Sequence, residues 1–446
     1  MNRPNIIFYF SDQQRWDTLG CYGQKLDVTP NLDRLAAEGV LFENAFTCQP
    51  VCGPARACLQ TGRYATQVGC HTNARALPFG KIKTLAQYFN DAGYDTAYVG
   101  KWHLASDAYK GENFETCAIP QERRGGYKDY WMASDVLEFT SHGYNGYVYN
   151  GANEKVEFTG YRADCINNYA IDYVRNYDKD HPFFLFISQI EPHHQNDRRR
   201  FEGPDGSYAR FSGFETPGDL EDCRGKGDWE KNYPDYLGCC HSLDANVGRL
   251  VDTLKEKGMW DNTILFYTSD HGSHFRTRNS EYKRSCHEAS IHIPLIAVGP
   301  GFEGGKREKH VVSLIDLPTT LLDCAGIARP EGFCGRSLRT LMRGDVPAWD
   351  DTAFLQISEA QVGRAIRTPK WKYSVRAEGN GWDTAGADVY YEEFLYDLEA
   401  DPFEKNNLAA DPGYAEVRSQ LAKQLCVKMA EAGEDVPEIR PYKEWP

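Results

Sequence analysis

Short apolar runs alternate with amphipathic stretches through most of the chain. Four runs have the length and the β-branched or aromatic content of buried strands, at residues 5–10, 95–99, 182–190 and 263–268. Between them, apolar positions three or four residues apart predict helices, most clearly at residues 31–39, 83–92 and 244–257. This alternation predicts an α/β fold with a large, mostly parallel mixed sheet flanked by helices.

The pattern changes after Trp349. Short strand-like runs follow one another at residues 353–357, 362–367, 371–375 and 394–397, and a helical pattern covers residues 414–432. These elements predict a small antiparallel sheet with a helix. We therefore expect two domains, a large α/β domain over residues 1–348 and a smaller α+β subdomain over residues 349–446.

Two stretches of the large domain lack a clear period. Residues 125–161 are rich in Gly and Tyr, and residues 195–235 are polar with several Gly and Pro. We expect both to be long loops or insertions, which in compact domains often carry function.

Polar, chemically capable residues follow each of the four clear strands. They are Asp12 and Gln13 after the first, Lys101 and His103 after the second, His193 and His194 after the third, and Asp270 and His271 after the fourth. Because ligands bind at the carboxyl ends of parallel strands, we expect these groups to converge. Carboxylates with an amide or imidazole suit a divalent cation, while Lys and His suit an anionic substrate and proton transfer.

The segment from Cys52 to Arg63 adds a fifth element. Pro54 suits the first turn of a helix, which would place Cys52 just before the helix start. An anion or a thiolate there meets free backbone N–H groups and the positive end of the helix dipole. Arg56 lies four residues after Cys52, on the same face, and can hold it or a neighbouring anion.

Cys52, Pro54 and Arg56, followed by Leu59, Thr61, Gly62 and Arg63, resemble the signature of the formylglycine-dependent sulfatases. Further motifs look like those of the family in the same order along the chain: residues 4–7 with Asp12, residues 29–36, 100–103, 270–272 and 293–295, and residues 395–404. The resemblance implies an alkaline-phosphatase-like fold and the hydrolysis of a sulfate ester, as in bacterial carbohydrate sulfatases.

The resemblance also implies roles for the matching residues. Cys52 would be converted to formylglycine by a formylglycine-generating or anaerobic sulfatase-maturating enzyme, and Arg56 would hold the formylglycine hydrate. Calcium, or another divalent metal, would be bound with the modified Cys52 by a set of four side chains: Asp12, Gln13, Asp270 and His271.

The substrate side is implied in the same way. Lys101 and Lys283 would bind the sulfate, His103 would help to eliminate it, and His193 would act on the leaving group. Arg276, Arg278 and His194 are candidates for selecting a carboxylate or second sulfate on a sugar, although a salt-bridged loop is an equal interpretation for the two arginines. The aromatic residues of 125–161 could stack on a sugar, but an aromatic hairpin packed on the domain is favoured.

Two departures from the family pattern concern the metal. Gln13 stands where many sulfatases carry a second Asp, and His271 stands where many carry Asn. Gln13 lowers the negative charge, and the nitrogen of His271 could favour a metal softer than calcium. The same two residues fit a phosphonate monoester or phosphodiester hydrolase of the same superfamily, which is the alternative function. A sulfated-glycan binder without catalysis is a third, disfavoured by the intact Cys52 and Arg56.

Composition limits the partners. With 50 Lys+Arg against 64 Asp+Glu, the net charge of −14 opposes binding to nucleic acid or to a membrane surface. The 14 cysteines are dispersed, and the sequence shows no leader-like segment, no 18-residue apolar run and no Asn-x-Ser/Thr site. These features predict free thiols, a cytoplasmic location and small sulfated saccharides, such as glycosaminoglycan fragments, as substrates.

Overall fold

The large sheet forms the centre of the protein. A computed structural model describes residues 3–344 and 348–445, and its strand order is β11-β2-β10-β9-β1-β8-β3-β4-β6-β5, with β7 paired to β6. The strand bounds are β1 Asn5–Ser11, β2 Val40–Phe46, β3 Asp95–Lys101, β4 Tyr130–Ser134, β5 Ser141–His142, β6 Asn145–Asn150, β7 Lys155–Thr159, β8 Phe183–Ser188, β9 Thr263–Ser269, β10 Leu295–Val298 and β11 Lys306–Ser313.

The four predicted strands lie side by side in the middle of this sheet. β9, β1, β8 and β3 are mutually parallel, with Ile6 of β1 opposite Phe184 of β8 and Ile264 of β9. The predicted mixed sheet is confirmed: the strands at its centre are parallel, while β10 is antiparallel to both β9 and β2. All four strands therefore end at the same edge, where the chemically capable residues were expected to meet.

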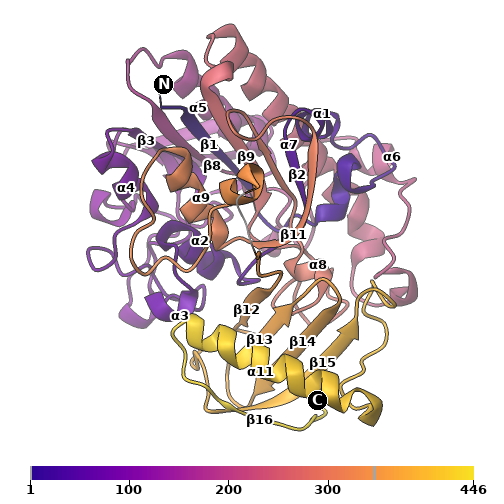
Figure 1. Ribbon diagram of the computed structural model, residues 1–446. Helices are drawn as coiled ribbons and strands as arrows, with labels where there is room; N and C mark the ends of the chain where they lie inside the picture. Colours follow the sequence, from indigo (N-terminus) through magenta and orange to yellow (C-terminus); the bar gives the residue numbers. More distant parts are fainter. Residues whose placement is uncertain (1–2, 345–347, 446) are drawn as a thin grey trace.

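Helices cover both faces of the large sheet (Figure 1). Ile6, Phe8 and Phe10 of β1 pack in one core with residues of α2, α4 and α9, while Ile7 and Tyr9 pack on the opposite side with α1, α5 and α7. The helix bounds are α1 Pro30–Glu38, α2 Cys52–Thr61, α3 Ala65–Val68, α4 Leu85–Asp91, α5 Arg162–Arg175, α6 Ser207–Phe211, α7 Trp229–Glu256, α8 Glu288–Ile291, α9 Asp316–Cys324 and α10 Arg339–Arg343.

The two stretches predicted as long loops in fact contain strands and helices. Residues 125–161 contain β4 to β7, which extend the large sheet, and Tyr127 and Trp131 are buried in its core. The interpretation as a packed aromatic hairpin therefore describes this stretch better than sugar stacking. α7 also begins earlier than predicted, at Trp229, because Trp229, Tyr233 and Leu237 bury a face that the surrounding polar residues obscured in the sequence.

The small sheet has the order β12-β13-β14-β15-β16, antiparallel except for the β15–β16 pair. Its bounds are β12 Ala353–Ile357, β13 Val362–Arg367, β14 Trp371–Ala377, β15 Val389–Asp397 and β16 Glu438–Arg440, with α11 Ala415–Glu431 lying across it (Figure 1). This confirms the predicted small antiparallel sheet and helix. The domain boundary at residues 348 and 349 stays a prediction.

Gly100 is required where β3 reaches the site edge. It has a φ of +103°, and a Cβ on it would lie 2.0 Å from the carbonyl oxygen of Ser188 in β8. We expect Gly100→Ala to lower the free energy of unfolding by about 3–5 kcal/mol, from backbone strain plus overpacking. Denaturant titration measures this loss.

Gly23→Ala is the matched control for Gly100→Ala. Gly23 has a similar φ of +109°, but nothing lies within 4 Å of the position of its Cβ. Gly23→Ala should therefore lower the free energy of unfolding only by the backbone strain, about 1–2 kcal/mol. Equal losses in the two variants would show that the approach of Ser188 is unimportant.

Candidate active site

Cys52 lies at the N-terminus of α2 with three of the predicted residues around its sulfur. Its Sγ is 2.7 Å from Lys283 Nζ, 3.1 Å from His271 Nε2 and 3.4 Å from Asp12 Oδ1. The helix begins at Cys52 itself, so Pro54 occupies the third helical position and not the first. Burial alone would raise the pKa of the Cys52 thiol, but Lys101, Lys283 and His271 hold it well below its usual range.

Asp12 is buried between two cations. Its Oδ2 accepts hydrogen bonds from Lys101 Nζ at 2.7 Å and from Arg56 Nη2 at 3.0 Å. Arg56 also donates to Ser188 Oγ at 2.6 Å, at the end of β8. Burial would raise the pKa of Asp12, but Lys101, His193 and Arg56 outweigh burial and hold it below its ordinary value.

The structure brings together a set of possible metal ligands. One ligand atom from each of Asp12, Cys52, Asp270 and His271 lies within 4.8 Å of all the others, and all four residues are buried. His271 Nδ1 donates to the carbonyl of Gly272 at 2.9 Å, so its Nε2 is the ring nitrogen that faces Cys52. Asp12, Asp270 and His271 follow β1 and β9, whose ends were expected to bring such groups together, while Cys52 comes from α2.

Two buried oxygens of this region test whether the residues fit a cation. Gln13 Oε1 accepts no hydrogen bond from any described residue, and Asp270 Oδ2 also accepts none but lies 3.6 Å from Arg56 Nη2 in an ion pair. Asp270 Oδ1 is occupied, since it accepts from the backbone N–H groups of Gln13 and His271. Because unsatisfied buried oxygens are rare, the free Gln13 oxygen, together with an Asp270 oxygen that accepts no hydrogen bond, fits the ligand set of a divalent cation.

The two adjacent histidines differ in their surroundings. His193 Nδ1 donates to the carbonyl of His194, and its Nε2 lies 3.2 Å from Lys283 Nζ. Burial and the charge of Lys283 lower the pKa of His193. The ring of His194 instead stacks on Tyr282 with a centroid separation of 4.4 Å, and its Nε2 meets no hydrogen-bond partner among the described residues.

The segment after β3 is held in an unusual conformation. His103 has a φ of +56°, and Gln13, at the equivalent place after β1, has a φ of +68°. Non-glycine residues adopt this conformation at a cost, typically where neighbouring contacts fix them at functional sites. Asp135 supplies such contacts by accepting hydrogen bonds from the backbone N–H groups of Leu104, Ala105 and Ser106.

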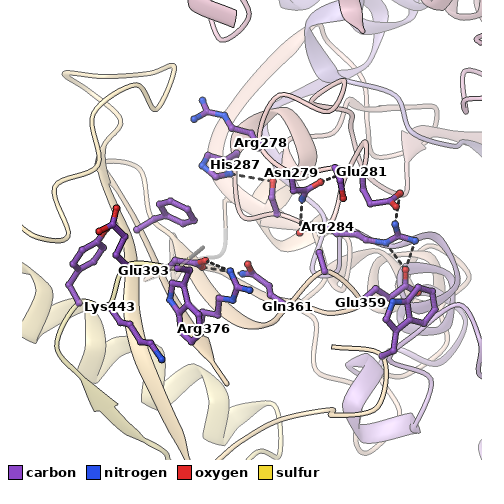
Figure 2. Close-up of a pocket in the computed structure, with 18 residues that line it drawn as sticks. Arg278, Asn279, Glu281, Arg284, His287, Glu359, Gln361, Arg376, Glu393 and Lys443 are labelled. Carbon is purple, nitrogen blue, oxygen red and sulfur yellow. Dashed lines mark hydrogen bonds and ion pairs between the residues drawn. The ribbon is translucent and has the colours of Figure 1, made fainter. Parts of the chain in front are cut away.

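Among the described residues, neither Arg276 nor Arg278 forms a hydrogen bond or ion pair with the Cys52 cluster. Arg276 is exposed and donates to the carbonyl of Ser280, while Arg278 donates to the carbonyls of Phe403 and Glu404. Arg278 and Arg284 line a cavity of about 690 Å³ between the segment on both sides of Lys283 and the small sheet (Figure 2). Their part in substrate selection stays a prediction.

Several residues around the site were not predicted. Ser188 contacts Arg56, Asn73 Oδ1 accepts from the backbone N–H of Gly53 at 2.9 Å, and Glu138 Oε2 lies 3.9 Å from His193 Nδ1. Ser188 ends β8, so the rule that identified the other strand ends could have found it. Asn73 and Glu138 lie in segments where no sequence period marks them.

The fold and the site together define the class of protein. It is an α/β protein of the alkaline-phosphatase-like type, with a nucleophile-bearing helix and buried carboxylates at the sheet edge. The chain matches the family described as Sulfatase over residues 4–327, and the family described as N-sulphoglucosamine sulphohydrolase, C-terminal, over residues 280–431. The chain belongs to the sulfatase family, whose members are sulfuric ester hydrolases.

Relatives of known name support this membership. The chain is 32% identical over 467 residues to the uncharacterized sulfatase YidJ of Escherichia coli. The alignment covers 95% of this chain and 87% of the relative. The chain is 27% identical over 503 residues to an N-acetylglucosamine-6-O-sulfatase of Bacteroides thetaiotaomicron, covering 95% and 86%. A solved structure from glycosaminoglycan metabolism in Bacteroides thetaiotaomicron shares the fold, with a TM-score of 0.80, 22% identity and 97% coverage of each chain.

Other predictions concern cysteines and membranes. None of the 14 cysteines is paired in a disulfide, which agrees with the free thiols predicted for the cysteines other than Cys52. None of the helices among the described residues combines the length and apolarity that a membrane crossing requires. The cytoplasmic location stays a prediction.

The pKa of Asp270 leads to a test of the buried cluster. Burial and the charge of Asp12 raise the pKa of Asp270 to about 7 without a cation. A raised carboxyl pKa stabilises the folded state below the unfolded value, near 4, and this contribution is lost as the pH rises to 7. Relative to Asp270→Asn, wild-type protein should lose up to about 1.4 kcal/mol of unfolding free energy per pH unit in this window.

Urea unfolding in a chelator, with unmodified Cys52, measures this difference. Ionisable groups that do not contact Asp270 contribute equally in both proteins, so their effects cancel when the two are subtracted. A difference that stays constant from pH 4 to pH 7 would contradict the raised pKa of Asp270.

Proposed function

We propose that the protein hydrolyses a sulfate ester on a carbohydrate, with a formylglycine made from Cys52. One observation carries the proposal: the buried Cys52 Sγ lies within 3.4 Å of Lys283, His271 and Asp12, at the N-terminus of α2. An N-acetylglucosamine-6-O-sulfatase among the relatives supports a carbohydrate, such as a glycosaminoglycan-derived mono- or oligosaccharide.

Asp12, Gln13, Asp270 and His271 would hold the divalent metal, together with the modified Cys52. When bound, such a metal neutralises charge on the sulfate and its nucleophile, and a formylglycine hydrate offers a nucleophilic oxygen. The oxygen-rich ligand set supports calcium, while His271 supports a softer metal as the alternative. The modification requires a maturating enzyme as a partner.

Two lysine side chains give the site the positive charge that an anionic substrate requires. Lys283 Nζ lies 2.7 Å from the Cys52 sulfur, and Lys101 Nζ, at the end of β3, lies 2.7 Å from Asp12 Oδ2, which follows β1. In our proposal both ammonium groups hold the sulfate oxygens, and Arg56 holds the modified Cys52. Such groups act strongly because they are fixed in place and shielded from water.

His193 is our candidate for the leaving-group side. Its Nδ1 donates to the carbonyl of His194, which leaves Nε2 directed toward Lys283 and available to carry a proton. A protonated Nε2 can donate that proton to the departing sugar oxygen. His103, whose Nδ1 meets no hydrogen-bond partner in the described residues, is our candidate for the elimination of sulfate.

The rival is a phosphonate monoester or phosphodiester hydrolase, which Gln13 and His271 favour. Sulfate and phosphonate monoesters of one phenol should separate the two functions. We expect matured protein to hydrolyse the sulfate at least about 100-fold faster, and Cys52→Ala to lose at least about 1,000-fold in kcat.

Mass spectrometry of the same preparation checks that Cys52 has become the aldehyde. A faster reaction with the phosphonate would establish the rival function. Sulfatase activity that persists in Cys52→Ala, with unmodified Cys52 in the wild type, would refute the proposed nucleophile.

Gln13→Asp tests the metal site without relying on activity. It adds a second carboxylate directly after Asp12, so calcium should bind about 10-fold more tightly by calorimetry. Without metal, the same variant should be less stable than wild type, because the new carboxylate is buried beside Asp12 and Asp270. Unchanged calcium affinity in this variant would exclude Gln13 from the ligand set.

A further inference from the structure

Two non-glycine residues in the left-handed conformation face each other beside the catalytic site. Arg284, directly after Lys283, has a φ of +68°, and Glu359, just after β12 of the small sheet, has a φ of +64°. Arg284 Nε and Nη2 both lie 2.5 Å from Glu359 Oε2, and the Glu359 side chain is fully buried. Figure 2 shows this pair at one side of the cavity. Strain of this kind persists only where surrounding contacts fix the residues.

The other carboxylate oxygen of Glu359 leads toward Cys52. Glu359 Oε1 accepts a hydrogen bond from the backbone N–H of Asn73 at 2.7 Å. The Asn73 side chain in turn accepts from the backbone N–H of Gly53 at 2.9 Å. Gly53 follows Cys52 in the first turn of α2, where amides lack partners inside the helix. This path therefore fixes the start of the helix that carries Cys52.

The Arg284 side of the pair leads to Lys283. The carbonyl of Lys283 accepts from Asn279 Nδ2 at 3.0 Å, and the backbone N–H of Arg284 donates to Pro50 at 3.2 Å. The Lys283 side chain is thus held with its Nζ 2.7 Å from the Cys52 sulfur. One carboxylate of the small sheet contacts both segments that meet at this sulfur.

We propose that Glu359 is a positioning residue, which sets the distance between the start of α2 and the Lys283 ammonium. The proposal rests on the proposed function, since that function gives Cys52 and Lys283 their roles. Both oxygens of Glu359 accept hydrogen bonds, so glutamine cannot replace it: its amide group would face either the Asn73 N–H or the Arg284 guanidinium, donor against donor. Aspartate keeps both acceptors on a stem that is shorter by one carbon.

Steady-state kinetics with a small aryl sulfate tests this role, because such a substrate leaves the saccharide contacts empty. We expect Glu359→Gln to lower kcat about 10- to 100-fold and to change KM less than about 3-fold, as a displacement of reacting groups does. Glu359→Asp should lose less than Glu359→Gln. If Glu359→Gln does not fold, Arg284→Lys carries the test, since lysine keeps the charge but loses the two-pronged contact.

Glu434→Gln is the matched control. Glu434 pairs with the buried Arg364 of the same small unit, with distances of 2.7 and 2.9 Å to Arg364 Nε, and contacts Thr66 and Gln356, away from Cys52 and Lys283. The kcat of Glu434→Gln should stay within about 2-fold of wild type, even if its melting temperature falls as much as that of Glu359→Gln. Equal losses of kcat in the two variants would overturn the proposal, as would an effect of Glu359→Gln confined to the KM of a saccharide.

A second measurement separates this proposal from the proposed function. If the wild-type protein hydrolyses no sulfate ester, the proposed function fails, and the affinity for inorganic sulfate by calorimetry then tests the positioning role. Displacement of Lys283 should weaken sulfate binding about 10-fold in Glu359→Gln and leave it unchanged in Glu434→Gln. Equal sulfate affinities in wild type and Glu359→Gln would overturn the proposal.

Discussion

The site depends on the burial of Asp12 between Arg56 and Lys101. These groups are almost inaccessible to water, and a buried charge without its partner costs several kcal/mol. They come from the end of β1, from α2 and from the end of β3, so the charges balance only when β1, β8 and β3 are adjacent and α2 is docked on them. Ser188 of β8 adds its hydroxyl to Arg56 between the two strands. The strand order and the docking of α2 are therefore required for the charges of the site to be paired, and the paired charges in turn stabilise that arrangement.

This constraint explains why much of the site could be predicted. Parallel strands must end at the same edge, so Asp12, Lys101, His193 and Asp270 could be placed together from strand ends alone. The strands of 130–159 could not be predicted in the same way, because frequent Gly and Tyr conceal the alternation around Trp131 and Val148. The start of α7 was missed for a related reason: Pro234 and the polar residues around it suggest a loop, whereas burial of Trp229 and Tyr233 stabilises a helix.

The contacts that fix the Cys52 segment lie beyond what sequence periodicity can predict. Asn73 and Glu359 are polar residues in connecting segments, 286 positions apart in their contact, and nothing in their neighbours distinguishes them from exposed turn residues. Only the packing of the small sheet against the large one brings them together. Strand ends specify which groups meet, but segments from distant parts of the chain specify how closely they meet.

The charge of the whole chain and the charge of the site have opposite signs. The chain carries −14, yet Arg56, Lys101 and Lys283 outnumber the carboxylates Asp12 and Asp270 around Cys52. Exposed charges more than about 10 Å away are screened by salt, so the buried cations determine the attraction of a small anion. Sulfate and phosphonate monoesters both carry one negative charge, so charge does not distinguish them. The number of hydrogen-bond acceptors distinguishes the two esters. A sulfate ester offers three free oxygens, while a phosphonate monoester has a carbon in place of one of them. A buried cation facing that carbon would lack a partner, so donors placed to contact all three free oxygens would favour sulfate.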